Sequence, residues 1–218
     1  MSSVRSQVRF GAVILAAGAS TRLGQPKQLL EIDGQPMVAR ALAAALEALA
    51  GPVVVVLGAN ADSVRSACRT ASQSGHSSNR VLFANNPDWA EGMGSSIRIG
   101  IRALEAAAPN LDAALIAVCD QPAFSTQSIL RLVEALTTPG KSIAAARYSG
   151  RNGTPVIFRR EHFDLLANLT GDRGAQRLLA LNPAKVASVE MPELALDIDQ
   201  PSDLERVVKT QLKEKVAT

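Results

Sequence analysis

The sequence predicts an α/β fold built on a mostly parallel sheet. Three strongly apolar runs recur along the 218 residues, at positions 13–17, 53–57 and 113–118. Longer stretches with apolar residues at helical spacing separate them. This alternation is typical of parallel strands joined by crossover helices, and strands without a polar face suit burial on both sides of a sheet.

The remaining elements follow from the same patterns. Four segments with apolar positions at helical spacing are expected to be helices: 37–49, 63–70, 95–107 and 125–136. Pro36 suits the start of the first of them. Less regular patterns predict a short strand at 81–84 and a strand-like run at 155–158. They also predict a helix at 175–181 and a terminal helix after Pro201. The polar, Gly/Ser-rich segment 71–80 predicts a surface loop.

Composition narrows the functional classes. With 47% hydrophobic residues, the chain can form one substantial core, and a single domain over residues 1–218 is expected. Its 23 basic and 20 acidic residues give a formal charge of +3 without a basic stripe, so no nucleic-acid partner is expected. No run reaches membrane-spanning length, and no signal peptide is evident. Cys68 and Cys119 lack metal-ligand spacing and fit a reducing compartment. These features predict a cytoplasmic protein that does not associate with a membrane.

The segment 13–30, VILAAGASTRLGQPKQLL, gives the strongest functional signal. Gly18 and Gly24 allow sharp turns and close approach, so that successive N–H groups can face an anion. Arg22 offers a planar fork for two phosphate oxygens, and Lys27 is a compact, mobile charge. The segment therefore predicts a triphosphate-binding loop.

Two other phosphate-binding loops do not fit. The dinucleotide fingerprint G-x-G-x-x-G fails because no glycine stands two residues after Gly18, and a P-loop fails because Gln28 follows Lys27. The loop instead resembles the nucleotidyltransferase pattern L-A-A/G-G-x-S-x-R-x-G-x-x-K-x-L, which is met by Leu15, Ala16, Ala17, Gly18, Ser20, Arg22, Gly24, Lys27 and Leu29.

Carboxylates follow two further segments. In LIAVCDQP, Asp120 ends an apolar strand, and ligands of open α/β sheets bind beyond the carboxyl ends of the strands. Asp120 is therefore expected beside the Gly18 loop as a ligand of Mg²⁺ bound to a triphosphate. The alternative role, a helix cap, suits Ser125 or Thr126 better. In LDIDQPSDL, Asp197 and Asp199 lie on one face of an extended chain, and one of them could complete the metal site.

The segment 85–101, NNPDWAEGMGSSIRIGI, places small residues before a predicted helix. Backbone N–H groups at a helix start can bind an anion or a base edge, so Gly94 and Ser95 are candidate nucleotide contacts. Trp89 is either a packing anchor or a platform for a base. Neither His76, in the polar loop, nor His162, beside an aromatic residue, is expected to bind a metal or to act in catalysis.

Together these segments resemble the family of molybdenum cofactor nucleotidyltransferases, specifically its cytidylyltransferase branch. The resemblance covers nearly the whole chain, through LAAGASTRLGQPKQLL, NPDWAEGMGSSIRIGI, CDQP, RNGTPVIF, GDRGAQRLL and DIDQPSDL. It implies a Rossmann-like nucleotidyltransferase fold with three α/β/α layers. The implied reaction is Mg²⁺-dependent transfer of CMP from CTP to the molybdopterin cofactor with release of pyrophosphate. Mn²⁺ is an alternative metal, and a molybdenum hydroxylase is a candidate client.

The resemblance also implies residue roles. The GTP-using branch carries a second glycine where Ala17 stands, which favours CTP here. Nucleotide binding falls within about residues 9–122 and acceptor binding within about 140–200. The transfer needs positioning and charge neutralisation rather than a protein nucleophile, and the residues expected to supply them are Arg22, Lys27 and Asp120. The acceptor contacts expected in the second part are Asn152, Gly153, Thr154 and Asp172, although two ordinary turns and a helix cap would account for the same residues.

Three alternatives remain open from the sequence. The first is a nucleotidyltransferase for another phosphorylated acceptor. The second is a non-catalytic carrier that delivers finished cofactor to a molybdenum hydroxylase. The third, a nicotinamide-dependent reductase, lacks the dinucleotide fingerprint.

Overall fold

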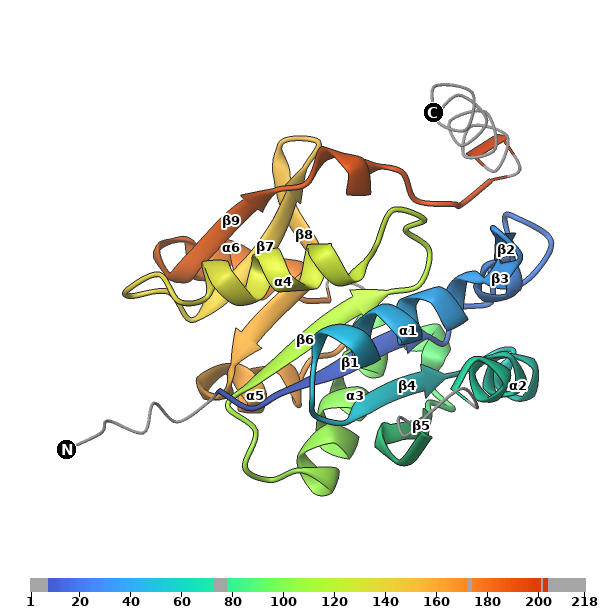
Figure 1. Ribbon diagram of the computed structural model, residues 1–218, viewed down its shortest axis with the longest axis horizontal. Helices are drawn as coiled ribbons and strands as arrows, with labels where there is room; N and C mark the ends of the chain where they lie inside the picture. The colour runs from blue at the N-terminus through green and yellow to red at the C-terminus, as the bar shows by residue number, and fades with distance from the viewer. Residues whose placement is uncertain (1–7, 73–77, 172–173, 201, 204–218) are drawn as a thin grey trace.

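A seven-stranded sheet organises the protein in a computed structural model that describes residues 8–72, 78–171, 174–200 and 202–203 (Figure 1). The strand order is β5-β4-β1-β6-β8-β7-β9, and among the described strands of this sheet only β8 runs antiparallel to its neighbours. The strands are β1 (Phe10–Ala16), β4 (Val53–Leu57), β5 (Val81–Asn85), β6 (Ala113–Val118), β7 (Ile143–Tyr148), β8 (Arg151–Arg159) and β9 (Val186–Glu190). Two short strands, β2 (Glu31–Ile32) and β3 (Gln35–Pro36), form a separate ribbon. The predicted α/β fold with a mostly parallel sheet is confirmed.

Helices cover both faces of this sheet (Figure 1). One face packs against α1 (Met37–Ala48), α2 (Ala61–Ser72) and α4 (Thr126–Ala135). The other packs against α3 (Met93–Ala107), α5 (Phe163–Leu166) and α6 (Gln176–Leu181). The chain is therefore the expected three-layer α/β/α structure. Short 3₁₀ helices complete it: η1 (Lys27–Leu29), η2 (Ser78–Arg80), η3 (Trp89–Glu91), η4 (Arg160–His162), η5 (Pro183–Lys185) and η6 (Pro192–Ala195).

Strand β1 explains why the apolar runs have no polar face. Ile14 packs into the core beneath α1, α2 and α4, whereas Val13 packs into the core beneath α3. Both side chains are fully buried. Helix α3 approaches β1 so closely that a Cβ atom at Gly100 would lie 2.3 Å from a methyl carbon of Val13. This contact fixes α3, and with it the turn before α3, against the central strand.

The structure extends or corrects several predicted boundaries. The run expected at 155–158 is part of the longer strand β8, and α2 continues to Ser72, into the segment expected to be a loop. Sequence analysis missed β7 and β9. Strand β7 is rich in alanine, a poor strand former, and β9 is an edge strand with exposed positions, so neither gives a strong apolar pattern. The terminal helix expected after Pro201, apart from residues 202–203, and His76 lie outside the described residues.

Two further expectations, a serine or threonine cap for α4 and buried cysteines, are met. Ser125 caps α4, with its hydroxyl oxygen accepting a hydrogen bond from the N–H of Ser128 at 3.4 Å. Cys68 and Cys119 are both buried as free thiols. Within the described part of the chain, none of the helices has the length and apolar character needed to cross a membrane.

The strand order creates a crevice beyond the carboxyl ends of β1 and β6. After β1, strands β4 and β5 are added toward one edge of the sheet. The chain then returns to the centre, where β6 pairs with the opposite side of β1. Open α/β sheets bind their ligands at such a reversal. The loop that starts at Gly18 follows β1, and Asp120 follows β6. Both therefore lie at this edge, where the sequence predicted them.

Candidate active site

The loop after β1 is shaped by Gln28, whose side chain is buried. Its amide nitrogen donates hydrogen bonds to the carbonyl oxygens of Gly18, at 2.7 Å, and Ala16, at 3.2 Å. The hydroxyl of Ser20 donates to the Gln28 carbonyl oxygen at 3.4 Å and accepts from the backbone N–H of Lys27 at 3.1 Å. Ser20 therefore ties the two ends of the loop together. Sequence analysis missed Gln28, although a glutamine beside two leucines in a short helix is a signal of a buried polar role.

Lys27 connects this loop to the two carboxylate segments. Its ammonium group contacts the carboxylate of Asp120 and lies 3.0 Å from that of Asp199, which also lies 3.5 Å from Arg22. Burial would lower the pKa of Lys27, but the carboxylates of Asp120 and Asp199 outweigh it and hold that pKa above its usual value. The hydrogen bond from Lys27 in turn lowers the pKa of Asp199. The structure thus brings together these four residues, which the sequence predicted at one site.

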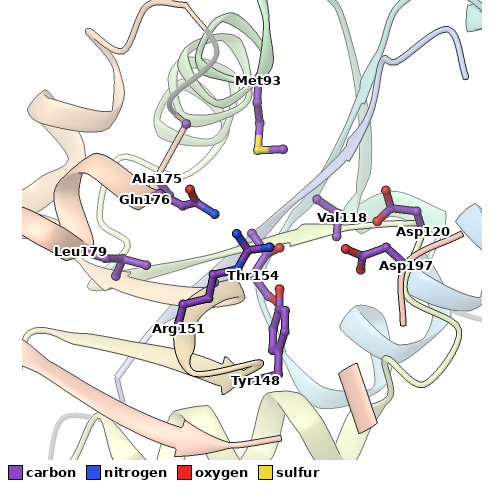
Figure 2. Close-up of a pocket in the computed structure, with 12 residues that line it drawn as sticks. Met93, Val118, Asp120, Tyr148, Arg151, Thr154, Ala175, Gln176, Leu179 and Asp197 are labelled. Atoms are coloured by element: carbon purple, nitrogen blue, oxygen red, sulfur yellow. The ribbon is translucent and has the colours of Figure 1, made fainter. Parts of the chain in front are cut away.

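Asp197 and Asp199 occupy different surroundings. Between them, the N–H of Ile198 donates to the carbonyl oxygen of Asp120 at 3.0 Å and fixes the segment against the end of β6. Asp199 pairs with the loop cations, whereas the carboxylate of Asp197 lies beside that of Asp120 (Figure 2). Burial and then the charge of Asp120 raise the pKa of Asp197 to about 6. The crowding of Asp120 and Asp197 leaves a local excess of negative charge.

Two cavities meet at Asp120. The first, which we call the loop cavity, has a volume of about 330 Å³ and is lined by Leu15, Ala17, Gly18, Lys27, Trp89 and Ser96, among others. The second, the hairpin cavity, has a volume of about 190 Å³ and is lined by residues of the β7–β8 hairpin together with Leu179 and Asp197 (Figure 2). Met93, Val118 and Asp120 line both. Two ligands bound in these cavities would meet beside the Asp120 carboxylate.

The carboxylates could hold a divalent metal only with help from a ligand. Among the described residues, no group of three His, Cys, Asp or Glu side chains is arranged to hold a metal ion. Mg²⁺ usually takes one or two protein carboxylates and fills its other positions with phosphate oxygens and water. The adjacent carboxylates of Asp120 and Asp197 fit that demand. Asp199 is engaged with Lys27 and Arg22 and is the less available of the expected pair.

Gly94 and Ser95, the expected nucleotide contacts at the start of α3, are engaged with other parts of the protein. The Ser95 hydroxyl is buried and hydrogen-bonds to the carbonyl oxygen of Gly92, at 2.9 Å, and the side-chain amide of Asn86, at 2.8 Å. The N–H of Gly94 donates to the carbonyl oxygen of Gly171 at 3.0 Å. Ser95 and Gly94 therefore hold the turn in place. Their neighbour Ser96 lines the loop cavity, together with Trp89, Gly92 and Met93 of the same segment.

The other candidate residues are distributed as follows. Gly153 and Thr154 line the hairpin cavity, as does Arg151, which sequence analysis did not single out. Asn152 does not line it, and its side-chain oxygen is buried without a hydrogen-bond partner among the described residues. Asp172 lies outside the described residues.

The aromatic and histidine candidates have packing roles. Trp89 packs against the core beneath α3 and also lines the loop cavity. His162 is buried and lies 2.8 Å from the hydroxyl of Ser142, away from both cavities. This supports a structural role for His162.

The raised pKa of Asp197 predicts a pH-dependent effect on stability. The pKa of Asp197 is about 6 in the folded protein and 3.8 in the unfolded chain, so the protonated carboxyl group favours the folded state. Its contribution to the free energy of unfolding is complete below pH 4 and is lost as the pH rises through 6. The free energy of unfolding of Asp197→Asn, relative to that of the wild type, should therefore be higher at pH 8 than at pH 4. Because part of the residue is exposed to solvent, we expect less than about 1 kcal/mol. Thermal denaturation of the variant and the wild type in EDTA, at pH 4 and pH 8, measures this change. The exposed Asp164→Asn variant is the control, and an equal change in that variant would contradict the prediction.

Comparison with known proteins gives a consistent family match. Residues 12–189 match the model of the MobA-like NTP transferase domain. The chain is 33% identical over 208 residues to nicotine blue oxidoreductase of Paenarthrobacter nicotinovorans, covering 90% of this chain and 95% of that protein. It is 30% identical over 214 residues to purine catabolism protein PucB of Bacillus subtilis, covering 94% and 98%. It is 23% identical over 191 residues to the molybdenum cofactor cytidylyltransferase of Escherichia coli, covering 88% and 91%.

Solved structures share the fold. The crystal structure of Rv0371c from Mycobacterium tuberculosis superposes with a TM-score of 0.74 at 26% identity, covering 93% of this chain and 98% of that one. A structure of the same protein in complex with manganese superposes with a TM-score of 0.70, also at 26% identity, covering 93% and 99%.

Proposed function

Because this chain belongs to the MobA-like NTP transferase family, we propose that it is a Mg²⁺-dependent enzyme that transfers CMP from CTP to the molybdopterin cofactor and releases pyrophosphate. The observation that carries the proposal is the position of Asp120. It lies on the shared wall of two cavities, in contact with Lys27 from the glycine-bearing loop. A transfer between two bound molecules needs this arrangement.

The loop cavity is the proposed nucleotide site. The backbone at Gly18 is held open by Gln28 and can approach the triphosphate closely, while Arg22 and Lys27 lie on the same loop to neutralise its charge. Trp89 and Ser96 line the far side of this cavity, where the nucleoside would lie.

The transfer itself requires little from the protein beyond placement and charge. An acceptor phosphate oxygen in the hairpin cavity attacks the α-phosphorus in line, the new P–O bond forms, and pyrophosphate leaves with the electrons of the broken bond. Both reactants are anions, so the enzyme lowers the barrier by positioning them and by offsetting their repulsion.

Asp120 and Asp197 are the residues proposed to hold the divalent ion. When bound, Mg²⁺ or Mn²⁺ would supply positive charge to phosphate oxygens of both reactants. The manganese complex of the related Rv0371c protein supports a divalent metal in this family. Lys27 contacts Asp120 and lines the loop cavity, so its ammonium group could contact the triphosphate instead when a nucleotide is bound.

The choice of CTP and of molybdopterin cofactor rests on narrower support. Ala17, where the GTP-using branch carries a second glycine, lines the loop cavity. The likeness to the Escherichia coli molybdenum cofactor cytidylyltransferase, at 23% identity, supports the same acceptor. A client molybdenum hydroxylase would follow from that acceptor.

A second candidate function comes from the 33% identical relative, which is named as an oxidoreductase of nicotine blue. A reductase of this kind would bind a nicotinamide dinucleotide. The loop after β1 lacks the G-x-G-x-x-G spacing that lets a helix start approach a pyrophosphate bridge, and it carries Arg22 and Lys27 instead. The site therefore favours a nucleoside triphosphate over a dinucleotide.

The test is pyrophosphate release from CTP, GTP, UTP and ATP, each with Mg²⁺ and molybdopterin cofactor. We expect release with CTP alone. Release with GTP would overturn the inference from Ala17 but retain the mechanism, and release only with other phosphorylated acceptors would replace the acceptor. Tight cofactor binding without release from any nucleotide would favour a carrier. A parallel assay of NAD(P)H oxidation with nicotine blue tests the reductase.

A further inference from the structure

We propose that Arg151 is the specificity-determining residue of the hairpin cavity and binds an oxyanion, in the first instance a phosphate, of the acceptor. The inference rests on the proposed function, because it assigns the second cavity to the acceptor. It also names the acceptor class: a small molecule with a phosphate joined to a body that tolerates apolar contact.

A tight turn fixes the position of Arg151. Strands β7 and β8 are joined by Ser149 and Gly150, which have φ angles of 50° and 76°. Positive φ at both central residues is the signature of the two-residue hairpin turn that matches strand twist. Tyr148 and Arg151 are therefore direct cross-strand partners, and both line the hairpin cavity.

The base of this hairpin is rigid. The Tyr148 hydroxyl donates to the carbonyl oxygen of Thr154 at 2.9 Å and accepts from the side-chain amide of Gln121 at 3.0 Å. A Cβ atom at Gly153 would lie 2.7 Å from that hydroxyl oxygen, so the Tyr148 side chain packs over Gly153 in space that a larger residue would occupy. Through Tyr148, these contacts hold the start of β8 close to Gln121, the residue that follows Asp120.

The guanidinium of Arg151 is available to a ligand. It extends over the cavity beside Thr154 (Figure 2). It forms no hydrogen bond or ion pair with any other described residue, and the residue is exposed. By contrast, the neighbouring Arg147 lies 3.0 Å from Glu190 on β9. An arginine without a protein partner at a cavity mouth retains its full set of donors for an oxyanion.

Charge balance supports the same assignment. The described residues that line the hairpin cavity include two carboxylates, Asp120 and Asp197, and Arg151 is the only basic residue among them. Arg22 and Lys27 belong to the loop side. Without Arg151, the described residues that line this cavity would offer an incoming acceptor phosphate two carboxylates and no cationic side chain. The planar fork of arginine can hold two oxygens of one phosphate and leave a third oxygen free to attack.

The rest of the cavity limits the acceptor further. Apolar side chains also line the cavity: Leu179 lies across it from the carboxylates, and Met93 and Val118 add further apolar surface (Figure 2). An acceptor that consists only of phosphate and hydroxyl groups would leave these surfaces without a matching contact. A phosphate joined to a flat or partly apolar body fits both ends of the cavity.

The experiment compares Arg151→Ala and Arg151→Lys with Arg147→Ala, a control in the same hairpin whose arginine already has a partner. Nucleotide binding is followed by the fluorescence of Trp89, the single tryptophan of the chain, which lines the loop cavity. We expect Arg151→Ala to raise the KM for molybdopterin cofactor by about 10- to 100-fold, the loss typical of one charged hydrogen-bonding contact. The KM and fluorescence-derived affinity for Mg²⁺-CTP should change less than about twofold. Arg151→Lys should recover part of the loss, because it keeps the charge and loses the fork.

An unchanged acceptor KM in an active Arg151→Ala enzyme would overturn the inference and leave the proposed function intact. If the wild type turns over no acceptor, the proposed function fails and inorganic phosphate becomes the probe. Phenylglyoxal modification of Arg151, measured by mass spectrometry, should then be slowed by phosphate more strongly than modification of Arg147. Equal rates with and without phosphate would overturn the oxyanion site itself.

Discussion

Replacing Asp120 by asparagine is expected to lower Mg²⁺-dependent pyrophosphate release on the order of 10³-fold, the scale seen when one main charge contact of phosphoryl-type transfer is removed. The substitution keeps size and removes charge. Asp120 lies where the two cavities meet, and its carboxylate contacts Lys27 and lies beside Asp197. Loss of its charge should therefore affect metal binding and the orientation of both reactants at once.

The control for this prediction lies at the other end of the same strand. Asp112 precedes β6, and its carboxylate accepts a hydrogen bond from the N–H of Arg9 at 2.8 Å, far from the crevice. Asp112→Asn should leave turnover within about twofold, because distant sites act independently. Initial rates over a range of Mg²⁺ concentrations, with circular dichroism to verify folding, provide the measurement. An Asp120→Asn enzyme with near wild-type rates would remove this residue from the mechanism.

The second large effect is expected from Lys27→Met. This change removes the cation that joins the loop to Asp120 and Asp199 and should lower turnover on the order of 10² to 10³-fold. It should also alter metal binding in the absence of nucleotide. In the structure, the ammonium of Lys27 contacts a carboxylate that is proposed to hold the metal, so ammonium and metal compete for it. We therefore expect Mn²⁺ to bind the variant more tightly than the wild type when no nucleotide is present.

Direct Mn²⁺ binding, followed by electron paramagnetic resonance or calorimetry, separates these effects from catalysis. The Lys27 and Asp120 side chains are only 20% and 17% exposed, so the metal-free variant should also unfold at a lower temperature, and Mn²⁺ should restore part of the loss. Lys185→Met provides the control, because Lys185 pairs with Glu161 at 2.9 Å on the exposed surface. Weaker Mn²⁺ binding by Lys27→Met than by wild type would show that Lys27 does not compete for the metal carboxylates.

The framework of the site could be predicted from residue patterns alone. The apolar runs at β1, β4 and β6 have no polar face because each strand is buried between two helical layers, so pattern alone identified them. A parallel sheet then places the residues after β1 and β6 at one edge, whichever helices connect them. This is why Lys27 and Asp120, which are distant in the chain, were expected together and are found in contact.

The side chains that complete that site depend on contacts between elements that folding brings together. Asp197 and Asp199 are two residues apart and equivalent in sequence, but the hydrogen bond from Ile198 to the end of β6 directs one toward the hairpin cavity and the other toward the loop cations. Ser96 rather than Ser95 lines the loop cavity, because one residue of helix rotation points these neighbouring side chains in different directions.

The same limit applies to Gln28 and Arg151, which sequence analysis did not select. Gln28 shapes the loop by reaching back to the carbonyl oxygen at the end of β1, and Arg151 enters the cavity because a two-residue turn pairs it with Tyr148. Such roles depend on the direction of a side chain and on partners brought close by folding. Residue type and spacing fix which elements form and which edge of the sheet they reach, but the contacts between elements fix which of their side chains meet.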